Sequence, residues 1–283
     1  MKYFIDFVIN KNCDLNCEYC TSRASICDNE VYDFEQFKKD FNHFADLGID
    51  FEATLIGGEP FCNKDIFKYV DYINSLNKNI TINIFTNGLY LSKAKEKVWE
   101  KLSESKCNLW ITIYSCSEIN YNEIINKCIK YNIKYSTSHY NYDIEHAKKF
   151  RLYNVRNIYR LYNLRNKMRI HKFCESNSEE YKNKAKLREC ITCKDETVPI
   201  CIRAFNGILY YGACFPMLKN VDKIFGSNLN EKLIENEDYI KIENIKVPIE
   251  ITSVKFCKNH CRFLGEAPWK KSKKERIEFF VEE

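Results

Sequence analysis

The sequence predicts an α/β fold built on a parallel β-sheet. Short apolar runs rich in aromatic and β-branched residues alternate with amphipathic segments through the first 150 residues, which is the pattern of repeated βαβ units. Polar and glycine-rich segments directly follow several of these runs. Beyond about residue 174 the pattern changes to cysteine-rich loops, so we expect a first domain over residues 1–175 and a second, smaller α+β domain over 176–283.

The apolar runs predict five strands, at residues 3–9, 51–56, 80–85, 109–114 and 133–137, and a weakly marked sixth at about 157–162. The segments between them predict helices at residues 34–47, 66–73, 92–103, 121–131 and 144–150. In the first of these, four phenylalanines recur at spacings of three and four residues, and Gly48 is a natural stop. Residues 200–214 predict a hairpin that turns at Asn206-Gly207.

Composition excludes several classes of protein. Hydrophobic residues make up 45% of the 283-residue chain and aromatic residues 14%, so an ordered globular protein is expected. No apolar run approaches the roughly 18 residues that a membrane helix needs, and we expect a cytoplasmic protein. The net charge of +5 is too small to indicate a nucleic-acid partner.

Basic residues gather in one segment. Nine Lys or Arg and no Asp or Glu lie between Lys148 and Lys172. Two interpretations stay open: a solvated face, or a site for an anionic group such as a phosphate, nucleotide or carboxylate.

Fifteen cysteines in a reducing compartment indicate metal ligation rather than disulfides. Cys13, Cys17 and Cys20 place three thiolates within eight residues, directly after the first predicted strand. Three protein ligands on a cluster of four irons would leave one iron open to bind and reduce a cofactor. A structural zinc knuckle is the alternative, although zinc sites favour four ligands in paired spacing.

The motif C-x3-C-x2-C after the first strand, with Tyr19 before its last cysteine, resembles the radical S-adenosylmethionine (AdoMet, or SAM) superfamily. Further motifs follow in order: Gly57-Gly58-Glu59-Pro60, Thr86-Asn87-Gly88 and Ser115. The resemblance implies that the glycines and Glu59 bind the AdoMet amino group, and that Thr86, Asn87 and Ser115 contribute to the same site. It also implies a partial (β/α)6 TIM barrel, and a 4Fe-4S cluster that cleaves AdoMet to a 5′-deoxyadenosyl radical.

Cysteines of the second half resemble the twitch or SPASM extensions of this superfamily, which hold auxiliary iron-sulfur clusters. The expected ligands of one such 4Fe-4S cluster are Cys201, Cys214, Cys257 and Cys261, with Cys190 and Cys193 as alternates. Cys116, next to Ser115, is a candidate hydrogen donor to a substrate radical, as an epimerase requires. The remaining cysteines are expected to be small buried packing residues.

The expected function is hydrogen abstraction from a small polar, sugar-like substrate, leading to dehydrogenation or epimerisation, with a flavodoxin or ferredoxin as reductant. An auxiliary cluster suits dehydrogenation because a substrate radical must then lose an electron. The first alternative is a maturase of a ribosomally made peptide. The alternative of another class is a non-catalytic iron-sulfur or zinc protein.

Overall fold

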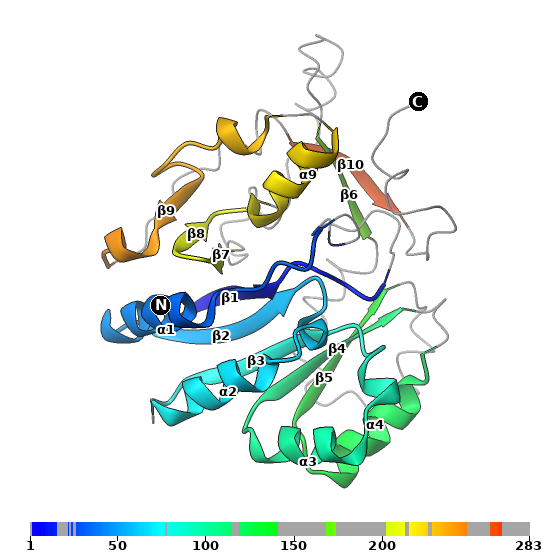
Figure 1. The fold of residues 1–283 in the computed structure, drawn as a ribbon. Helices are drawn as coiled ribbons and strands as arrows, with labels where there is room; N and C mark the ends of the chain where they lie inside the picture. The colour runs from blue at the N-terminus through cyan, green and yellow to red at the C-terminus, as the bar shows by residue number, and fades with distance from the viewer. Residues whose placement is uncertain are drawn as a thin grey trace.

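The computed structural model describes residues 2–15, 22, 24, 27–76, 78–114, 119–140, 168–173, 202–212, 215–225, 228–247 and 261–267. In this part of the chain a mixed sheet of eight strands has the order β5-β4-β3-β2-β1-β7-β8-β9 (Figure 1). Its first five strands are parallel and follow chain order: β1 (Lys2–Asn10), β2 (Asp50–Gly57), β3 (Thr81–Thr86), β4 (Asn108–Tyr114) and β5 (Tyr135–Tyr140). The predicted α/β fold is therefore confirmed, and the open parallel sheet fits a partial barrel.

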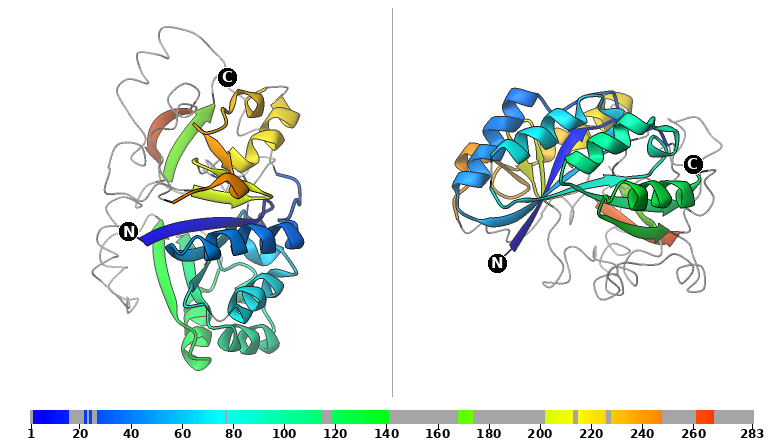
Figure 2. Two further views of the ribbon diagram at one scale, coloured as in Figure 1. Left: turned by 90° about the vertical axis from the view of Figure 1, so that its left-hand side faces the viewer. Right: turned by 90° about the horizontal axis from the view of Figure 1, so that it is seen from below.

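Four helices cover one face of this sheet (Figure 2): α1 (Phe34–Asp46), α2 (Ile66–Ser75), α3 (Glu96–Glu104) and α4 (Tyr121–Lys130). The phenylalanine stripe of α1 packs on Phe7 of β1, with ring centroids 5.4 Å, 5.3 Å and 6.0 Å from those of Phe37, Phe41 and Phe44. All four rings are fully buried. Because side chains alternate along a strand, Asp6 and Val8 point to the opposite, inner face.

Two predicted boundaries were wrong by several residues. The helix predicted at 92–103 begins at Glu96, because Leu91–Lys93 forms a separate 3₁₀ turn and Ala94 is extended, with ψ at 137°. The strand predicted at 133–137 is Tyr135–Tyr140, because Asn132 has a φ of +52° and the Ile133 amide still donates to the Cys128 carbonyl of α4. The helix predicted at 144–150 and the strand at 157–162 lie outside the described residues.

The predicted hairpin is confirmed and extends the main sheet. Strands β7 (Ile202–Phe205) and β8 (Ile208–Tyr210) turn at Asn206 and Gly207, which have φ values of +45° and +84°. Strand β7 runs parallel to β1, with Asp6 opposite Arg203. The hairpin is followed by α9 (Leu218–Phe225) and β9 (Tyr239–Lys241).

A second sheet pairs β6 (Met168–Phe173) with β10 (Cys261–Ala267) in antiparallel register. Both sheets thus combine strands from either side of residue 175, and the division of the chain there stays a prediction. Short 3₁₀ turns complete the described elements: Pro60–Cys62, Phe215–Met217, Asn230–Lys232 and Ile242–Asn244. No helix in the described ranges has the length and apolar character needed to cross a bilayer.

One buried carboxylate fastens the hairpin turn to α1. Asp40 Oδ2 accepts hydrogen bonds from the Tyr32 hydroxyl at 2.5 Å and from the Gly207 amide at 2.7 Å. Asp40 Oδ1 accepts from the Gln36 side chain at 2.8 Å. Burial and the nearby Asp40 charge raise the pKa of Tyr32 well above its ordinary value, so this phenol remains a proton donor.

Asp40→Ala should therefore destabilise the fold, because it leaves the buried Tyr32 hydroxyl and the Gly207 amide without their acceptor. The expected loss is about 1–3 kcal/mol for a buried group that is left unsatisfied, measured by urea denaturation. Lys39→Ala, an exposed neighbour on α1, is the control and should change stability by less than about 0.5 kcal/mol. Equal stability of the two variants would contradict the importance of this contact.

Candidate active site at the carboxyl edge of the parallel sheet

Three loops meet where β1, β2 and β3 end. They carry Asn10 to Cys13, Gly57 to Glu59, and Thr86 to Gly88, and the parallel register of the strands brings them to one edge of the sheet. The backbone joins the first two loops directly. The Gly58 amide donates to the Asn10 carbonyl at 3.1 Å, and the Glu59 amide donates to the Asn12 carbonyl at 2.8 Å. The carboxyl ends of parallel strands are where α/β folds place their sites.

Gly57 and Gly58 are required by the contact between these two loops. A Cβ atom on Gly57 would lie 1.9 Å from the Asn10 carbonyl oxygen, and one on Gly58 would lie 2.1 Å from the Asn12 carbonyl oxygen. Both distances are far inside van der Waals contact. These two glycines therefore allow the loop that carries Cys13 to lie directly against the loop after β2.

The Glu59 carboxylate ties the second loop to the third. Its Oε1 accepts from the Thr86 hydroxyl at 2.7 Å and from the Phe61 amide at 3.3 Å, and its Oε2 accepts from the Asn87 amide at 2.7 Å. The side chain is almost completely buried, with 1% of the residue exposed. Glu59, Thr86 and Asn87 therefore form one rigid unit.

Burial raises the pKa of Glu59 to about 8, and the negative charge of Asp14 adds to the rise, whereas the hydrogen bonds from Asn87, Thr86 and Phe61 oppose it. Within the described residues, no cationic side chain forms an ion pair with Glu59. A buried carboxyl that lacks a cation is a fitting partner for a ligand ammonium group. The buried carboxyl group of Glu59 is thus compatible with the AdoMet amino group as a ligand.

Cys13 lies at the centre of the three loops and is buried, with 9% of the residue exposed. Two nitrogen donors point at its sulfur: the Leu15 amide at 3.4 Å and the Asn87 side-chain nitrogen at 3.7 Å. Hydrogen-bond donors directed at sulfur stabilise a thiolate, which is the form that ligates iron. The surroundings of Cys13 therefore fit a cluster ligand.

Asn87 connects this thiol to the rest of the site. Its side-chain nitrogen also donates to Asp14 Oδ1 at 2.7 Å, while its side-chain oxygen accepts from the Leu89 amide at 2.8 Å. The Tyr121 hydroxyl of α4 donates to the Asn87 carbonyl at 3.2 Å. Asn87 is thus fixed on every side, which predicts little rearrangement when a ligand binds.

The sequence did not single out Asn10, Asn12 or Asp14. The Asn10 side-chain nitrogen donates to the Asn12 carbonyl at 2.8 Å and the Glu59 carbonyl at 3.0 Å, and the Asn12 side chain accepts from the Cys13 amide at 2.9 Å. The available signal was a pair of asparagines at a strand end directly before Cys13, a position where short amides hydrogen-bond to loop backbone.

Most other predicted site residues lie outside the described part of the chain: Cys17, Tyr19, Cys20, Ser115, Cys116, Cys190, Cys193, Cys201, Cys214 and Cys257. Cys261 is described by its backbone alone, as the first residue of β10 opposite Phe173. Within the described residues, no group of three or more metal-binding side chains is assembled. The roles of these residues stay predictions.

Three of the remaining cysteines are buried in the core: Cys27, Cys107 and Cys128. Burial raises the pKa of the Cys107 and Cys128 thiols to about 12. A thiol with so high a pKa is a poor metal ligand, which agrees with their interpretation as packing residues. Cys62 is half-buried.

Comparison with known proteins places these observations in a family. Residues 7–128 match the model of the radical SAM superfamily. A GTP 3′,8-cyclase from Staphylococcus epidermidis (strain ATCC 35984) is 26% identical over 99 residues, which cover 32% of this chain and 29% of that enzyme. The enzyme of Staphylococcus carnosus is 24% identical over the same shares. The chain thus spans less than a third of the length of these curated relatives.

Solved structures with a similar fold include anSMEcpe with bound AdoMet and Kp18Cys peptide, at a TM-score of 0.49 and 12% identity over 99% of this chain and 96% of that one. The complex of BtrN with AdoMet and 2-DOIA has a TM-score of 0.40 and 18% identity, over 48% of this chain and 57% of that one. SuiB from Streptococcus suis, bound to the precursor peptide SuiA, has a TM-score of 0.38 and 16% identity, over 77% and 60%.

The family match begins inside β1 and ends inside α4, so it spans the strands and loops that form the candidate site. Cys13, the Gly57-Gly58-Glu59 segment and the Thr86-Asn87 segment all lie within it and meet at one edge of the sheet. Residues 7–128 therefore carry the match to the radical SAM superfamily, and the candidate site lies within them.

Proposed function

We propose that this protein cleaves AdoMet reductively and uses the resulting 5′-deoxyadenosyl radical to abstract hydrogen from a small polar substrate. The observation that supports the proposal is the unit formed by Glu59, Thr86 and Asn87, whose buried carboxyl group is linked through Asn87 to the Cys13 sulfur. A carrier protein for electrons needs no such acceptor. The same observation therefore favours an enzyme over a non-catalytic iron-sulfur or zinc protein.

Each residue of the site has a proposed part. Cys13, Cys17 and Cys20 hold the 4Fe-4S cluster, and Asn87 and Leu15 direct hydrogen bonds at the Cys13 sulfur. Glu59 receives the AdoMet ammonium group, and Thr86 and Asn87 hold the Glu59 carboxylate in position. Tyr19 and Ser115 contribute further contacts to AdoMet. When bound, the cluster supplies the electron that splits the carbon-sulfur bond of AdoMet.

Polar side chains on the inner face of the sheet support a small polar substrate. Thr112 of β4 and Ser138 of β5 are half-buried, lie near the carboxyl ends of their strands, and are 3.5 Å apart at their hydroxyl oxygens. Deeper in the sheet, the Asn83 side chain donates to Glu52 at 2.9 Å and accepts from Asn108 at 3.2 Å. Hydroxyl and amide groups of this kind favour a sugar-like molecule.

Dehydrogenation or epimerisation is the proposed outcome for the substrate radical. In dehydrogenation the radical gives up one electron and one proton, and an auxiliary cluster held by Cys201, Cys214, Cys257 and Cys261, or by Cys190 and Cys193 in part, would accept the electron. In epimerisation Cys116 would donate a hydrogen atom. The curated relatives are named for cyclisation of GTP, but the matched 99 residues cover under a third of them, so their substrate is not carried over.

Replacing Cys13, Cys17 and Cys20 together by Ala should abolish formation of 5′-deoxyadenosine from AdoMet and dithionite after anaerobic reconstitution. If a second 4Fe-4S cluster is present, the variant should keep about half of roughly eight irons. The double variant Cys107→Ala/Cys128→Ala is the control, and it should retain cleavage because both thiols are packing residues. A full yield of 5′-deoxyadenosine from the triple variant would refute the cluster assignment.

AdoMet affinity should rise with pH, because only ionised Glu59 attracts an ammonium group and burial raises its pKa to about 8. Below that value, the dissociation constant of AdoMet should fall by up to about tenfold for each unit by which the pH rises. The test compares pH 6.0 with 7.5 by calorimetry, a range in which the AdoMet amine remains largely protonated.

Glu59→Gln should weaken AdoMet binding and remove this pH dependence. It should also lower stability by about 1–3 kcal/mol, because the side-chain NH2 of glutamine would face a buried donor that now has an acceptor. Folding is therefore checked by thermal melting. Thr86→Val is the matched control, since it removes a hydrogen bond to Glu59 but no charge and should keep the pH dependence. The same pH dependence in the Gln variant would show that another group titrates.

Gly57→Ala should displace the loop that carries Cys13, since its Cβ atom would meet the Asn10 carbonyl oxygen at 1.9 Å. We expect a large loss of AdoMet cleavage and a lower melting temperature. Gly48→Ala is the control. Gly48 has a φ of +68° and open space around it, so the change should cost about 1 kcal/mol of stability and leave cleavage intact. Normal cleavage in Gly57→Ala would contradict the proposed loop contact.

A further inference from the structure

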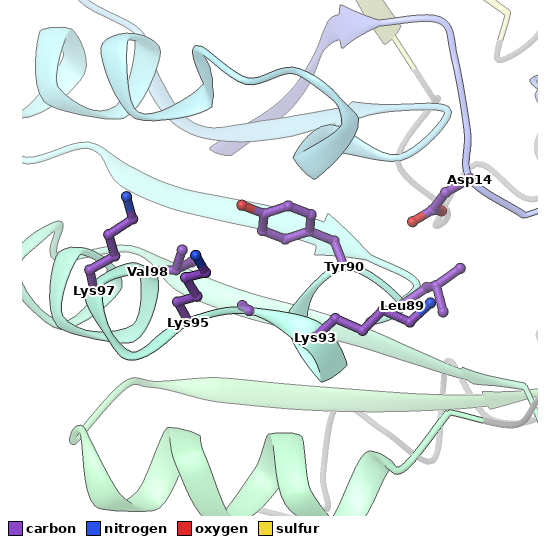
Figure 3. Close-up of a pocket in the computed structure, with 8 residues that line it drawn as sticks. Asp14, Leu89, Tyr90, Lys93, Lys95, Lys97 and Val98 are labelled. Atoms are coloured by element: carbon purple, nitrogen blue, oxygen red, sulfur yellow. The ribbon is translucent and has the colours of Figure 1, made fainter.

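A basic groove lies on the outer, helix-covered side of the candidate site (Figure 3). We call it the lysine groove; it has a volume of about 460 Å³, and its lining includes Asp14, Tyr90, Lys93, Lys95, Lys97 and Val98. The three lysines are exposed; in Figure 3, Lys95 and Lys97 lie to one side of the Tyr90 ring, and Lys93 extends the other way toward Leu89. They come from a short stretch of chain that contains the 3₁₀ turn after β3 and the start of α3.

The lining of the lysine groove holds three lysines and one carboxylate, Asp14, and so keeps a net positive charge. In the described part of the chain, no carboxylate forms an ion pair with Lys93, Lys95 or Lys97. Glu96, the acidic residue of the same stretch, instead contacts Lys127 of α4 and Tyr131, which directly follows that helix. The lysines also lie at the N-terminus of α3, where the helix dipole already disfavours cations. An unfavourable cluster of this kind indicates an external anionic partner.

Tyr90 gives the lysine groove a rigid aromatic centre. Its residue is 42% exposed, yet its ring stacks on buried Phe61 with centroids 5.5 Å apart and planes within 2°. Exposed aromatic residues that are held in place and surrounded by charge are typical of protein interfaces rather than of solvated surface. The combination favours a macromolecular partner over a free ion.

One end of the lysine groove reaches the proposed cluster ligand. Asp14 follows Cys13 in the chain, and Leu89 of the lining is hydrogen-bonded to Asn87, whose side chain contacts the Cys13 sulfur at 3.7 Å. A partner seated in the groove would therefore lie near Cys13, the proposed cluster ligand.

We propose that the lysine groove is the docking surface for an acidic one-electron carrier protein, an inference that rests on the proposed function. The carrier is oxidised by one electron, the cluster is reduced by one electron, and no atom is transferred. Redox partners bind through small interfaces, and their encounter is accelerated by complementary charge. The lysines supply that charge and Tyr90 supplies the contact.

The test measures 5′-deoxyadenosine formation with two reductants: an acidic flavodoxin, reduced by its reductase and NADPH, and dithionite. The groove variant is Lys93→Glu/Lys95→Glu/Lys97→Glu. The control variant is Lys39→Glu/Lys241→Glu/Lys246→Glu, which changes the net charge equally at exposed lysines elsewhere. With flavodoxin at low salt, the groove variant should be at least about tenfold slower than the wild type and the control variant.

With dithionite all three proteins should be equally active, because a small reductant needs no docking surface. The difference with flavodoxin should shrink at about 0.5 M salt, where charges are screened. The docking proposal would be overturned if the groove and control variants had equal rates with flavodoxin, or if the groove variant lost as much activity with dithionite as with flavodoxin. In either case, dithionite-driven cleavage by the wild type would still uphold the proposed function.

If the wild type cleaved no AdoMet with either reductant, both proposals would be overturned. If the groove variant lost oligonucleotide binding but kept the wild-type rate with flavodoxin, the partner would be a nucleic acid instead of a carrier protein.

Discussion

The buried carboxylate of Glu59 is the contact on which the candidate site depends. It joins the loops after β2 and β3 through Thr86 and Asn87, and its backbone joins the loop after β1 through Asn12. Three segments that are distant in sequence, one of which carries Cys13, are thereby joined by hydrogen bonds. An ionised carboxylate is costly to bury without a cation, and burial accordingly raises the pKa of Glu59 to about 8.

Much of the fold follows from the sequence because β1 to β5 alternate with helices of ordinary length and each strand has a clear apolar pattern. The positions of Gly57, Glu59 and Thr86 at strand ends could be predicted for the same reason. What the sequence could not provide are contacts between elements. Nothing local in Gly57-Gly58 indicates that the Asn10 and Asn12 carbonyls press against them, since that approach depends on the parallel pairing of β1 with β2.

The hairpin illustrates the same limit. Asn206-Gly207 predicts a tight turn from local backbone preference alone, and the turn is present. However, the hairpin attaches to the parallel sheet through β1, and its Gly207 amide donates to Asp40. Both partners lie more than 160 positions earlier in the chain. From the sequence alone, Asp40 is an ordinary polar position of an amphipathic helix, because its partner Gly207 is distant in the chain. Buried polar contacts of long sequence separation are therefore where sequence-based interpretation ends.

The two proposals use different faces of the sheet. Helices α1 to α4 cover the outer face (Figure 2), and the start of α3 contributes to the lining of the lysine groove. In β4, Ile111 and Ile113 on either side of Thr112 are buried toward the helices, so Thr112 points to the inner face. The Ser138 hydroxyl lies 3.5 Å from that of Thr112 and is on the same face. In the two proposals, the carrier protein and the substrate therefore bind on opposite faces of the sheet, so that neither obstructs the other.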